Sequence, residues 1–329
     1  MHIHPQLWPY IIGATLGLPL LILAGDALWQ RRARLTPAWR WGSAAALGFV
    51  ALLYGAGVYA TFIEPNELAV RRVTVLSDHW RGAPLTIAVL ADTHVGSPHV
   101  SAARVEQLVA HVDDLHPDLV VLLGDYVAGH TPSAARSDAE HTELTRSLAA
   151  FAMLDAPLGV IAVIGNHDNW YGQQEITQAL QDSGVAVLRN RNVTIRRQGG
   201  AFVIAGLADA MTDRPDFDAA LDGAPQGADT IVISHSPDPF PQMPRDVALM
   251  LAGHTHCGQV TLPLIGRPVT PTRYGQRYAC GRVDENGHTL YVNAGIGTSG
   301  LPIRFLNPPE LTLITIRAAS TNTQPSPPT

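Results

Sequence analysis

Short apolar runs recur throughout residues 65–317, and most of them end in polar residues. Their length and composition predict buried strands at 85–91, 119–123, 159–164, 202–205, 230–233, 248–252, 289–293 and 310–316. Segments with helical periodicity lie between several of these runs, at 100–115, 137–154 and 173–183. This alternation predicts an α/β fold in which helices cover the faces of a mostly parallel or mixed sheet.

Five of the predicted strands are followed directly by Asp, Asn or His. The five polar blocks read ADTH at 91–94, GDY at 124–126, GNHD at 165–168, SHSP at 234–237 and GHTH at 253–256. Sites in open α/β folds lie beyond the carboxyl ends of the strands. Buried Asp and His side chains are costly unless they are paired or coordinated. We therefore expect the five blocks to meet at one edge of the sheet and to bind metal.

The blocks contain seven metal donors: Asp92, His94, Asp125, Asn166, His235, His254 and His256. Imidazole nitrogen and carboxylate oxygen suit borderline divalent ions, so Mn, Fe and Zn all remain open. Seven donors are too many for one four-coordinate ion, but they suffice for two ions if one carboxylate bridges them. Two ions about 3.5–4 Å apart clamp the oxygens of an in-line displacement at phosphorus. The donor set therefore predicts a dinuclear centre for phosphoryl chemistry.

In this order, the blocks resemble the motifs of the calcineurin-like metallophosphoesterases: Asp-x-His, Gly-Asp, Gly-Asn-His-Asp/Glu, a single His and Gly-His-x-His. The ending YVNAGIGTSGLPIRFLNPPELTLITI resembles the membrane-anchored bacterial branch of that family. The resemblance implies a metallophosphoesterase-type sheet sandwich flanked by helices over 65–317. It also implies a metal-dependent phosphoric ester hydrolase acting on a phosphodiester, phosphomonoester or pyrophosphate. In such an enzyme a hydroxide that bridges the two metals attacks phosphorus.

The resemblance further implies a role for each residue. The first ion takes Asp92, His94 and His256, the second takes Asn166, His235 and His254, and Asp125 bridges them. His167 is the catalytic side chain that stabilises charge on the phosphoryl group or protonates the leaving oxygen. Asp168 orients His167 or His254, with a simple loop cap as the alternative.

Three residues outside the ligand set keep open alternatives. Arg304 either binds a phosphate of the substrate or makes a surface salt bridge. Cys257 and Cys280 are the only cysteines, too few for a disulfide scaffold or a four-cysteine zinc site. A disulfide between them is an option outside the cytoplasm, but their spacing does not demand it. Seven histidines off the strand ends, among them His130, are expected at the surface.

Two long apolar runs, at about 9–28 and 41–63, contain a single charge, Asp26. Each is long enough to cross about 30 Å of hydrocarbon as a helix. Residues 1–64 are therefore expected to be a membrane anchor with two transmembrane helices, and residues 318–329 a disordered tail. Four arginines lie between the runs, which places that linker in the cytoplasm and the catalytic domain in the periplasm, at the bacterial inner membrane. Arg71 and Arg72, close behind the second run, count against this orientation.

The composition limits the partners. All 22 basic residues are Arg, and against 28 acids they leave a net charge of -6, which disfavours a nucleic-acid ligand. A phosphorylated small molecule or lipid and the membrane are the expected partners, and the oligomeric state stays open. One alternative is a cytoplasm-facing nucleoside-diphospho-lipid pyrophosphatase of the UDP-diacylglucosamine type. Another is a non-catalytic, metal-stabilised membrane module, which the complete ligand set argues against.

Overall fold

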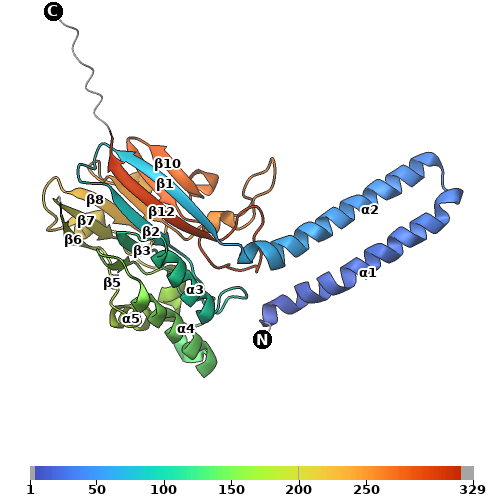
Figure 1. Cartoon of the computed structure of the whole chain (residues 1–329), viewed down its shortest axis with the longest axis horizontal. Helices are drawn as coiled ribbons and strands as arrows, with labels where there is room; N and C mark the ends of the chain where they lie inside the picture. The colour runs from blue at the N-terminus through green and yellow to red at the C-terminus, as the bar shows by residue number, and fades with distance from the viewer. Residues whose placement is uncertain (1–3, 199, 320–329) are drawn as a thin grey trace, which may run out of the picture.

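Two six-stranded sheets form the body of the protein (Figure 1). The computed structural model describes residues 4–198 and 200–319. The first sheet has the order β1 (Ala69–Ser77), β12 (Glu310–Ala318), β2 (Leu85–Leu90), β3 (Leu119–Leu122), β4 (Val160–Ala162) and β5 (Ala186–Val187). The second has the order β10 (Gly281–Glu285), β11 (His288–Val292), β9 (Leu249–Ala252), β8 (Asp229–Ile233), β7 (Gly200–Gly206) and β6 (Arg191–Arg197).

Parallel strands make up the centre of each sheet. In the first sheet β2, β3, β4 and β5 are parallel, and β12 runs antiparallel to β2. In the second sheet β7, β8, β9 and β11 are parallel, and the antiparallel strands β6 and β10 form its two edges. The carboxyl ends of the parallel strands carry the polar blocks, as expected for this class of fold.

The side chains of β2 show why the two sheets stack. Leu85, Ile87 and Val89 pack into a core shared by strands of both sheets. The alternate residues Ala88 and Leu90 pack against the helices. Because successive side chains of a strand point to opposite faces, a wholly apolar strand must be covered on both sides. The expected sheet sandwich flanked by helices is confirmed.

Three helices cover the outer face of the first sheet: α3 (Ala102–Asp113), α4 (Asp138–Ala150) and α5 (Asn166–Asp182). A short helix, α6 (Phe217–Leu221), packs on the second sheet. Serine side chains cap α3 and α4, since Ser101 accepts from the Arg104 amide and Ser137 forms a capping box with Glu140. Helix α5 begins inside a polar block, so its first turn brings Asn166 and His167 to the strand ends.

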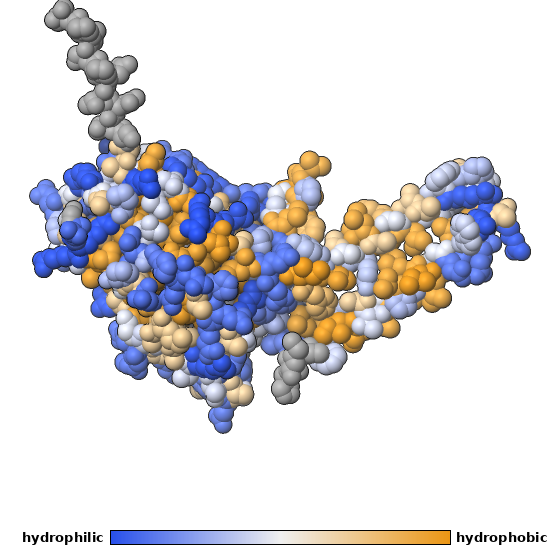
Figure 2. Space-filling view, in the orientation of Figure 1, coloured by the Kyte–Doolittle hydropathy of each residue, from blue (hydrophilic) through white to orange (hydrophobic). Residues whose placement is uncertain are grey.

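The N-terminal part of the chain is a pair of long helices, α1 (Trp8–Arg31) and α2 (Pro37–Val58), followed by the π-helical turn η3 (Tyr59–Ile63). They lie antiparallel and extend away from the sheets (Figure 1). Figure 2 shows hydrophobic residues along both helices and hydrophilic residues at the far end of the hairpin. By length and composition, the segments Pro5–Arg34 and Pro37–Asn66 are candidate membrane spans, and they contain both predicted runs.

Two expectations about the strands need correction. The polar blocks do not follow strands of a single sheet, because β2, β3 and β4 belong to the first sheet and β8 and β9 to the second. The expected tail at 318–329 begins too early, because Ala318 is the last residue of β12. Residues 320–329 lie outside the described part of the chain.

Candidate metal centre

The five polar blocks converge at one edge of the sandwich, where both sheets end. Backbone hydrogen bonds join neighbouring blocks: the amides of Asp92, His94 and Gly253 donate to the carbonyls of Gly124, Asp125 and His235, at 2.9, 3.0 and 2.8 Å respectively. The amide of His254 also donates to the Asp92 carboxylate, at 3.0 Å. The blocks therefore form one continuous surface, although they come from strands of different sheets.

Five of the seven donors lie on left-handed backbone. Asp92, His94, Asp125, His254 and His256 have φ values between 46° and 68°. This conformation is uncommon for residues with a Cβ, and it persists only where the surroundings hold it. These left-handed residues follow β2, β3 and β9. Such strain at several neighbouring positions is typical of a functional site.

One donor group consists of Asp92, His94 and His256. Their donor atoms lie within 4.8 Å of one another. The Nε2 atoms of His94 and His256 are 3.0 Å apart, and His256 Nε2 is 3.6 Å from Asp92 Oδ1. All three side chains are buried. These are the residues that the family resemblance assigns to the first ion.

A second donor group surrounds His235. Its Nε2 atom lies 3.2 Å from Asp125 Oδ2, 3.1 Å from Asn166 Oδ1 and 3.1 Å from His254 Nδ1. Asp125, His235 and His254 form a three-donor group within 4.8 Å. The family resemblance assigns Asn166, His235 and His254 to the second ion and makes Asp125 the ligand that bridges the two ions.

Asp125 lies between the two groups. Its Oδ2 atom is 3.2 Å from His235 Nε2 and 3.6 Å from His94 Nε2, so one oxygen faces donors on both sides. Its Oδ1 atom accepts the amide of His167 at 2.8 Å, which fixes the rotation of the carboxylate. A Cβ on Gly165 would overlap Asp125 Oδ1, so the block after β4 needs glycine there.

Backbone carbonyls orient three of the imidazole rings. The Nδ1 atoms of His94, His235 and His167 lie 3.2, 2.8 and 2.7 Å from the carbonyl oxygens of Val127, Leu123 and Gly129. A carbonyl partner requires a proton on Nδ1, so whenever the ring is neutral its Nε2 lone pair faces Asp125. Metal-binding histidines are commonly oriented through the other ring nitrogen in this way.

The charge balance of the cluster fits divalent cations. Burial lowers the pKa of His94 to about 3 and that of His254 to about 4, so both imidazoles are neutral. Burial would also lower the pKa of His235, but the Asp125 and Asp92 carboxylates outweigh it and raise this pKa well above its usual value. Burial raises the pKa of Asp92 to about 7. Neutral rings at His94 and His254, and carboxylates that draw positive charge onto His235, form a donor set in which a divalent Mn, Fe or Zn ion can take the place of that proton.

Asp168 contacts the backbone of the site, not a histidine ring. Its carboxylate accepts the amides of Gly165, Asp125, Tyr126 and Val127, at 2.9, 2.8, 2.8 and 3.3 Å. Among the described residues, no hydrogen bond joins Asp168 to the ring of His167 or His254. The expectation that it orients a ring is therefore wrong, and the loop cap is the better description. Asp168 holds together the blocks that carry Asp125 and Asn166.

Arg304 is neither a substrate ligand nor part of a surface salt bridge. Its side chain is fully buried, and its guanidinium donates to the carbonyls of Ala294, Gly295, Gly297 and Asn307. Its Nη2 atom lies 3.5 Å from His256 Nδ1, whereas the Nε2 atom of that ring faces the other donors. Both predictions for Arg304 are wrong, because the loop at 294–297 wraps around the guanidinium and uses its hydrogen bonds.

Residues that the motifs do not include surround His167. The ring of His130 stacks on the His167 ring, with centroids 4.9 Å apart, and both rings contact Trp170. His130 is exposed, as expected, but it lies beside the predicted catalytic residue. Its only signal in the sequence is its position five residues after Asp125. Cys257 and Cys280 form a disulfide bond, which resolves the alternative left open for them.

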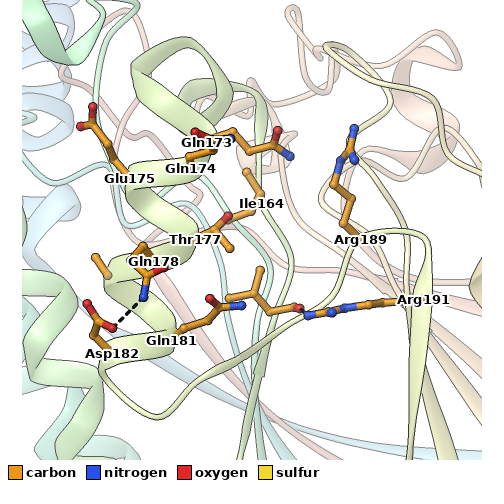
Figure 3. A pocket seen from close by; sticks show the side chains of 12 residues that line it. Ile164, Gln173, Gln174, Glu175, Thr177, Gln178, Gln181, Asp182, Arg189 and Arg191 are labelled. Atoms are coloured by element: carbon orange, nitrogen blue, oxygen red, sulfur yellow. Dashed lines mark hydrogen bonds between the residues drawn. The ribbon is translucent and has the colours of Figure 1, made fainter.

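A separate groove of about 920 Å³ lies between α5 and the segment 187–191 (Figure 3). Most of the residues that line it are polar or charged, among them Gln173, Gln181 and Arg191. Gln178 donates to Asp182 at 2.8 Å across one turn of α5. None of the seven metal donors is among its described lining residues, so this groove is not part of the metal centre.

Comparisons with known proteins agree with the geometry. Residues 85–258 match the calcineurin-like phosphoesterase family. The uncharacterized metallophosphoesterase YkuE of Bacillus subtilis (strain 168) is 31% identical over 286 residues, which cover 85% of this chain and 96% of that protein. The phosphodiesterase YaeI of Escherichia coli (strain K12) is 30% identical over 271 residues, 78% of this chain and 91% of that protein. A transmembrane protein with metallophosphoesterase domain from Danio rerio is 28% identical over 251 residues, 71% of this chain and 54% of that protein. The chain therefore belongs to the calcineurin-like phosphoesterase family, and the prediction of a metal-dependent phosphoric ester hydrolase is confirmed.

Proposed function

We propose that this protein is a membrane-anchored phosphoesterase that uses two divalent metal ions to hydrolyse a phosphodiester, phosphomonoester or pyrophosphate bond. The observation that carries the proposal is the position of Asp125. One oxygen of its carboxylate faces His94 of the first donor group and His235 of the second. When bound, two such ions supply a water activated near neutral pH and charge stabilisation for the phosphoryl oxygens.

The protein's own residues divide the remaining tasks. One ion would be held by Asp92, His94 and His256, and the other by Asn166, His235 and His254. Asp125 would bind both ions. The backbone carbonyls of Val127 and Leu123 keep the ligand rings in place through their Nδ1 atoms. His167 is held in the same way by Gly129, and its Nε2 atom is 4.0 Å from Asp125 Oδ2. His167 therefore has its Nε2 atom free to exchange a proton beside a phosphoryl group that occupies the centre, as a base when neutral and as an acid when protonated there.

We further propose that residues 1–64 anchor the enzyme and that residues 65–317 form the phosphoesterase domain. The two long apolar helices support the anchor, since both expose large apolar side chains, among them Leu20 and Ile22 in α1 and Phe49 and Leu52 in α2. The arginines of the linker support a cytoplasmic hairpin turn and a periplasmic domain. The Cys257–Cys280 disulfide supports the same side, because disulfides persist in oxidising compartments.

A metal-supplemented hydrolysis screen tests the proposal. Full-length protein stripped of metal would be assayed with Mn, Fe or Zn on an aryl phosphodiester, an aryl phosphomonoester and a pyrophosphate. We expect activity on at least one of them that depends on added metal, and about two ions bound per chain at saturation. Asp125→Asn should lose both bound metal and activity. Saturation at one ion, or wild-type activity without metal, would contradict the proposal.

A further inference from the structure

The segment that follows the last metal-binding block ends in an apolar turn. Residues 262–266 read LPLIG, and backbone hydrogen bonds of 2.8 and 2.9 Å join Leu262 and Gly266 in both directions. Leu264 stands at the tip with a φ of 68° and is fully exposed, and Ile265 beside it is 64% exposed. These two large apolar side chains lie in solvent and not in the core. Such exposed apolar surface usually marks an interaction site.

The apolar turn 262–266 emerges beside the end of α2. At its base, the Thr261 amide donates to the Phe305 carbonyl at 2.8 Å. The Phe305 ring packs edge-on against Tyr59 of η3, with centroids 6.5 Å apart. The Arg304 amide donates to the Ala60 carbonyl at 2.9 Å. In Figure 1 an orange loop projects at the base of the two helices, and in Figure 2 its tip is hydrophobic.

The surface around this turn continues that of the helix pair. Ile303 lines an apolar pocket of about 450 Å³ together with Tyr10 of α1 and Tyr54 of α2. Three more exposed apolar side chains flank the region: Ile63, Leu301 and Leu306. Trp8 and Tyr10 begin α1 at the same end at which Tyr59 closes α2, an arrangement typical of an aromatic belt at a membrane surface.

We propose that the apolar turn 262–266 inserts into the lipid surface beside α2, with Leu301 and Leu306 at its margin. The proposal rests on the membrane anchor of the proposed function. The occupant is lipid and not another protein, because this patch is continuous with two helices that would already be surrounded by lipid. The turn begins six residues after the metal donor His256, so its insertion would fix the height of the metal centre above the bilayer.

A depth measurement with a fluorescent label tests the insertion. The chain has two cysteines, both in the disulfide, so Leu264→Cys introduces a single reactive thiol. Full-length protein would be labelled with an environment-sensitive fluorophore and reconstituted into phosphatidylethanolamine–phosphatidylglycerol vesicles. Some vesicles would carry nitroxide near the headgroup and others near the end of the acyl chains. Matched labels at Leu20→Cys, in the middle of α1, and at Met153→Cys, an exposed apolar position after α4, provide the references.

We expect the shallow nitroxide to quench the Leu264 label several-fold more than the Met153 label, and the deep nitroxide to favour the Leu20 label. Quenching at Leu20 without quenching at Leu264 would overturn the insertion and leave the anchor intact. No quenching at either position would overturn the anchor and the insertion together. A Leu264 label that is shielded from iodide but not quenched by nitroxide would assign the turn to a protein contact, which also overturns the proposal. Metal-dependent hydrolysis is measured separately and is not affected by these outcomes.

Discussion

At the scale of single residues, His167 differs from the histidines around it. Its Nδ1 atom lies on a backbone carbonyl, as in His94 and His235, but its Nε2 atom is 4.0 Å from Asp125, farther than theirs. We predict that His167→Ala keeps its bound metal but loses turnover by roughly 10²–10⁴-fold, because a general acid–base group is removed. Metal analysis of the purified variant and its kcat on an aryl phosphoester check both parts.

Asp125→Asn is the control for that variant. It removes the charge that both donor groups share, so we expect loss of metal as well as loss of activity. The centre also contains a three-donor group made of His94, Asp125 and His167, which provides a sharp alternative. If His167→Ala loses as much metal as Asp125→Asn, then His167 is a ligand and the catalytic assignment is wrong.

Asp168 is predicted to act through the backbone. Its carboxylate accepts four amides of the loops that hold the donors, and each amide left unsatisfied costs about 1–3 kcal/mol. Asp168→Ala should therefore lower the melting temperature by several degrees and weaken metal binding, and Asp168→Asn should recover part of both losses. Calorimetry and metal titration measure these effects, with the exposed Asp78→Ala as a control that changes neither. Unchanged stability in Asp168→Ala would refute this account.

The donor types were predictable from the sequence because each follows a buried strand. The roles of Asp168 and Arg304 were not, because a motif gives the type of a residue but not the direction of its side chain. Asp168 turns toward backbone amides and Arg304 toward backbone carbonyls, and both bury charge that must be hydrogen-bonded. The stacking of His130 on His167 depends on how a loop folds back, which the local pattern does not encode.

At the scale of elements, Glu64 connects the end of α2 to the metal centre. It is buried, and its carboxylate accepts the amides of Leu306 and Asn307. The side-chain amide of Asn307 in turn donates to the carbonyls of His256 and Cys257, at 2.7 and 3.1 Å. The last residues before β1 therefore hold the loop that supports a metal donor.

Glu64→Ala is expected to destabilise the protein and to weaken metal binding. It removes the acceptor of the buried Asn307 amide, at a cost of about 1–3 kcal/mol, and that of the part-buried Leu306 amide. Glu64→Gln keeps one oxygen acceptor and should fall between Glu64→Ala and the wild type. Thermal unfolding and metal titration of the detergent-solubilised full chain measure the effect. Glu67→Ala, at an exposed position three residues later, is the matched control. Equal behaviour of Glu64→Ala and Glu67→Ala would show that the link to His256 has no energetic role.

Central strands were predicted far better than edge strands. β2, β3, β8 and β9 are buried on both faces, so their sequences are almost wholly apolar. β1 and β6 lie at sheet edges and carry exposed arginines, so they contain no such run. Without β6 and β10, the second sheet could not be distinguished from an extension of the first. The single-sheet expectation failed for that reason, although the five polar blocks do meet at the strand ends, as expected.

At the scale of the whole molecule, the hairpin of α1 and α2 joins the sheets close to the loops that follow the metal centre. The start of α1 and the end of α2 face the sheets and lie next to the loops 259–266 and 301–307. The opposite end of the hairpin carries Arg31, Arg32 and Arg34. The two ends of a spanning hairpin would lie on opposite sides of the membrane. The side that carries the arginines therefore determines on which side the phosphoesterase domain lies.

We predict that the hairpin turn is cytoplasmic and that the phosphoesterase domain is periplasmic. Arginine crosses the bilayer reluctantly, and the linker between the helices carries four of them, whereas Arg71 and Arg72 follow the second span as the only counterweight. Alkaline phosphatase fused after Ala318 should be active and a fluorescent protein that matures only in the cytoplasm should be dark. The same two reporters inserted after Arg34 should give the opposite pattern and serve as the control. A dark phosphatase and a bright fluorescent protein at Ala318 would place the domain in the cytoplasm, would leave the Cys257–Cys280 pair in a reducing compartment, and would favour the nucleoside-diphospho-lipid pyrophosphatase instead.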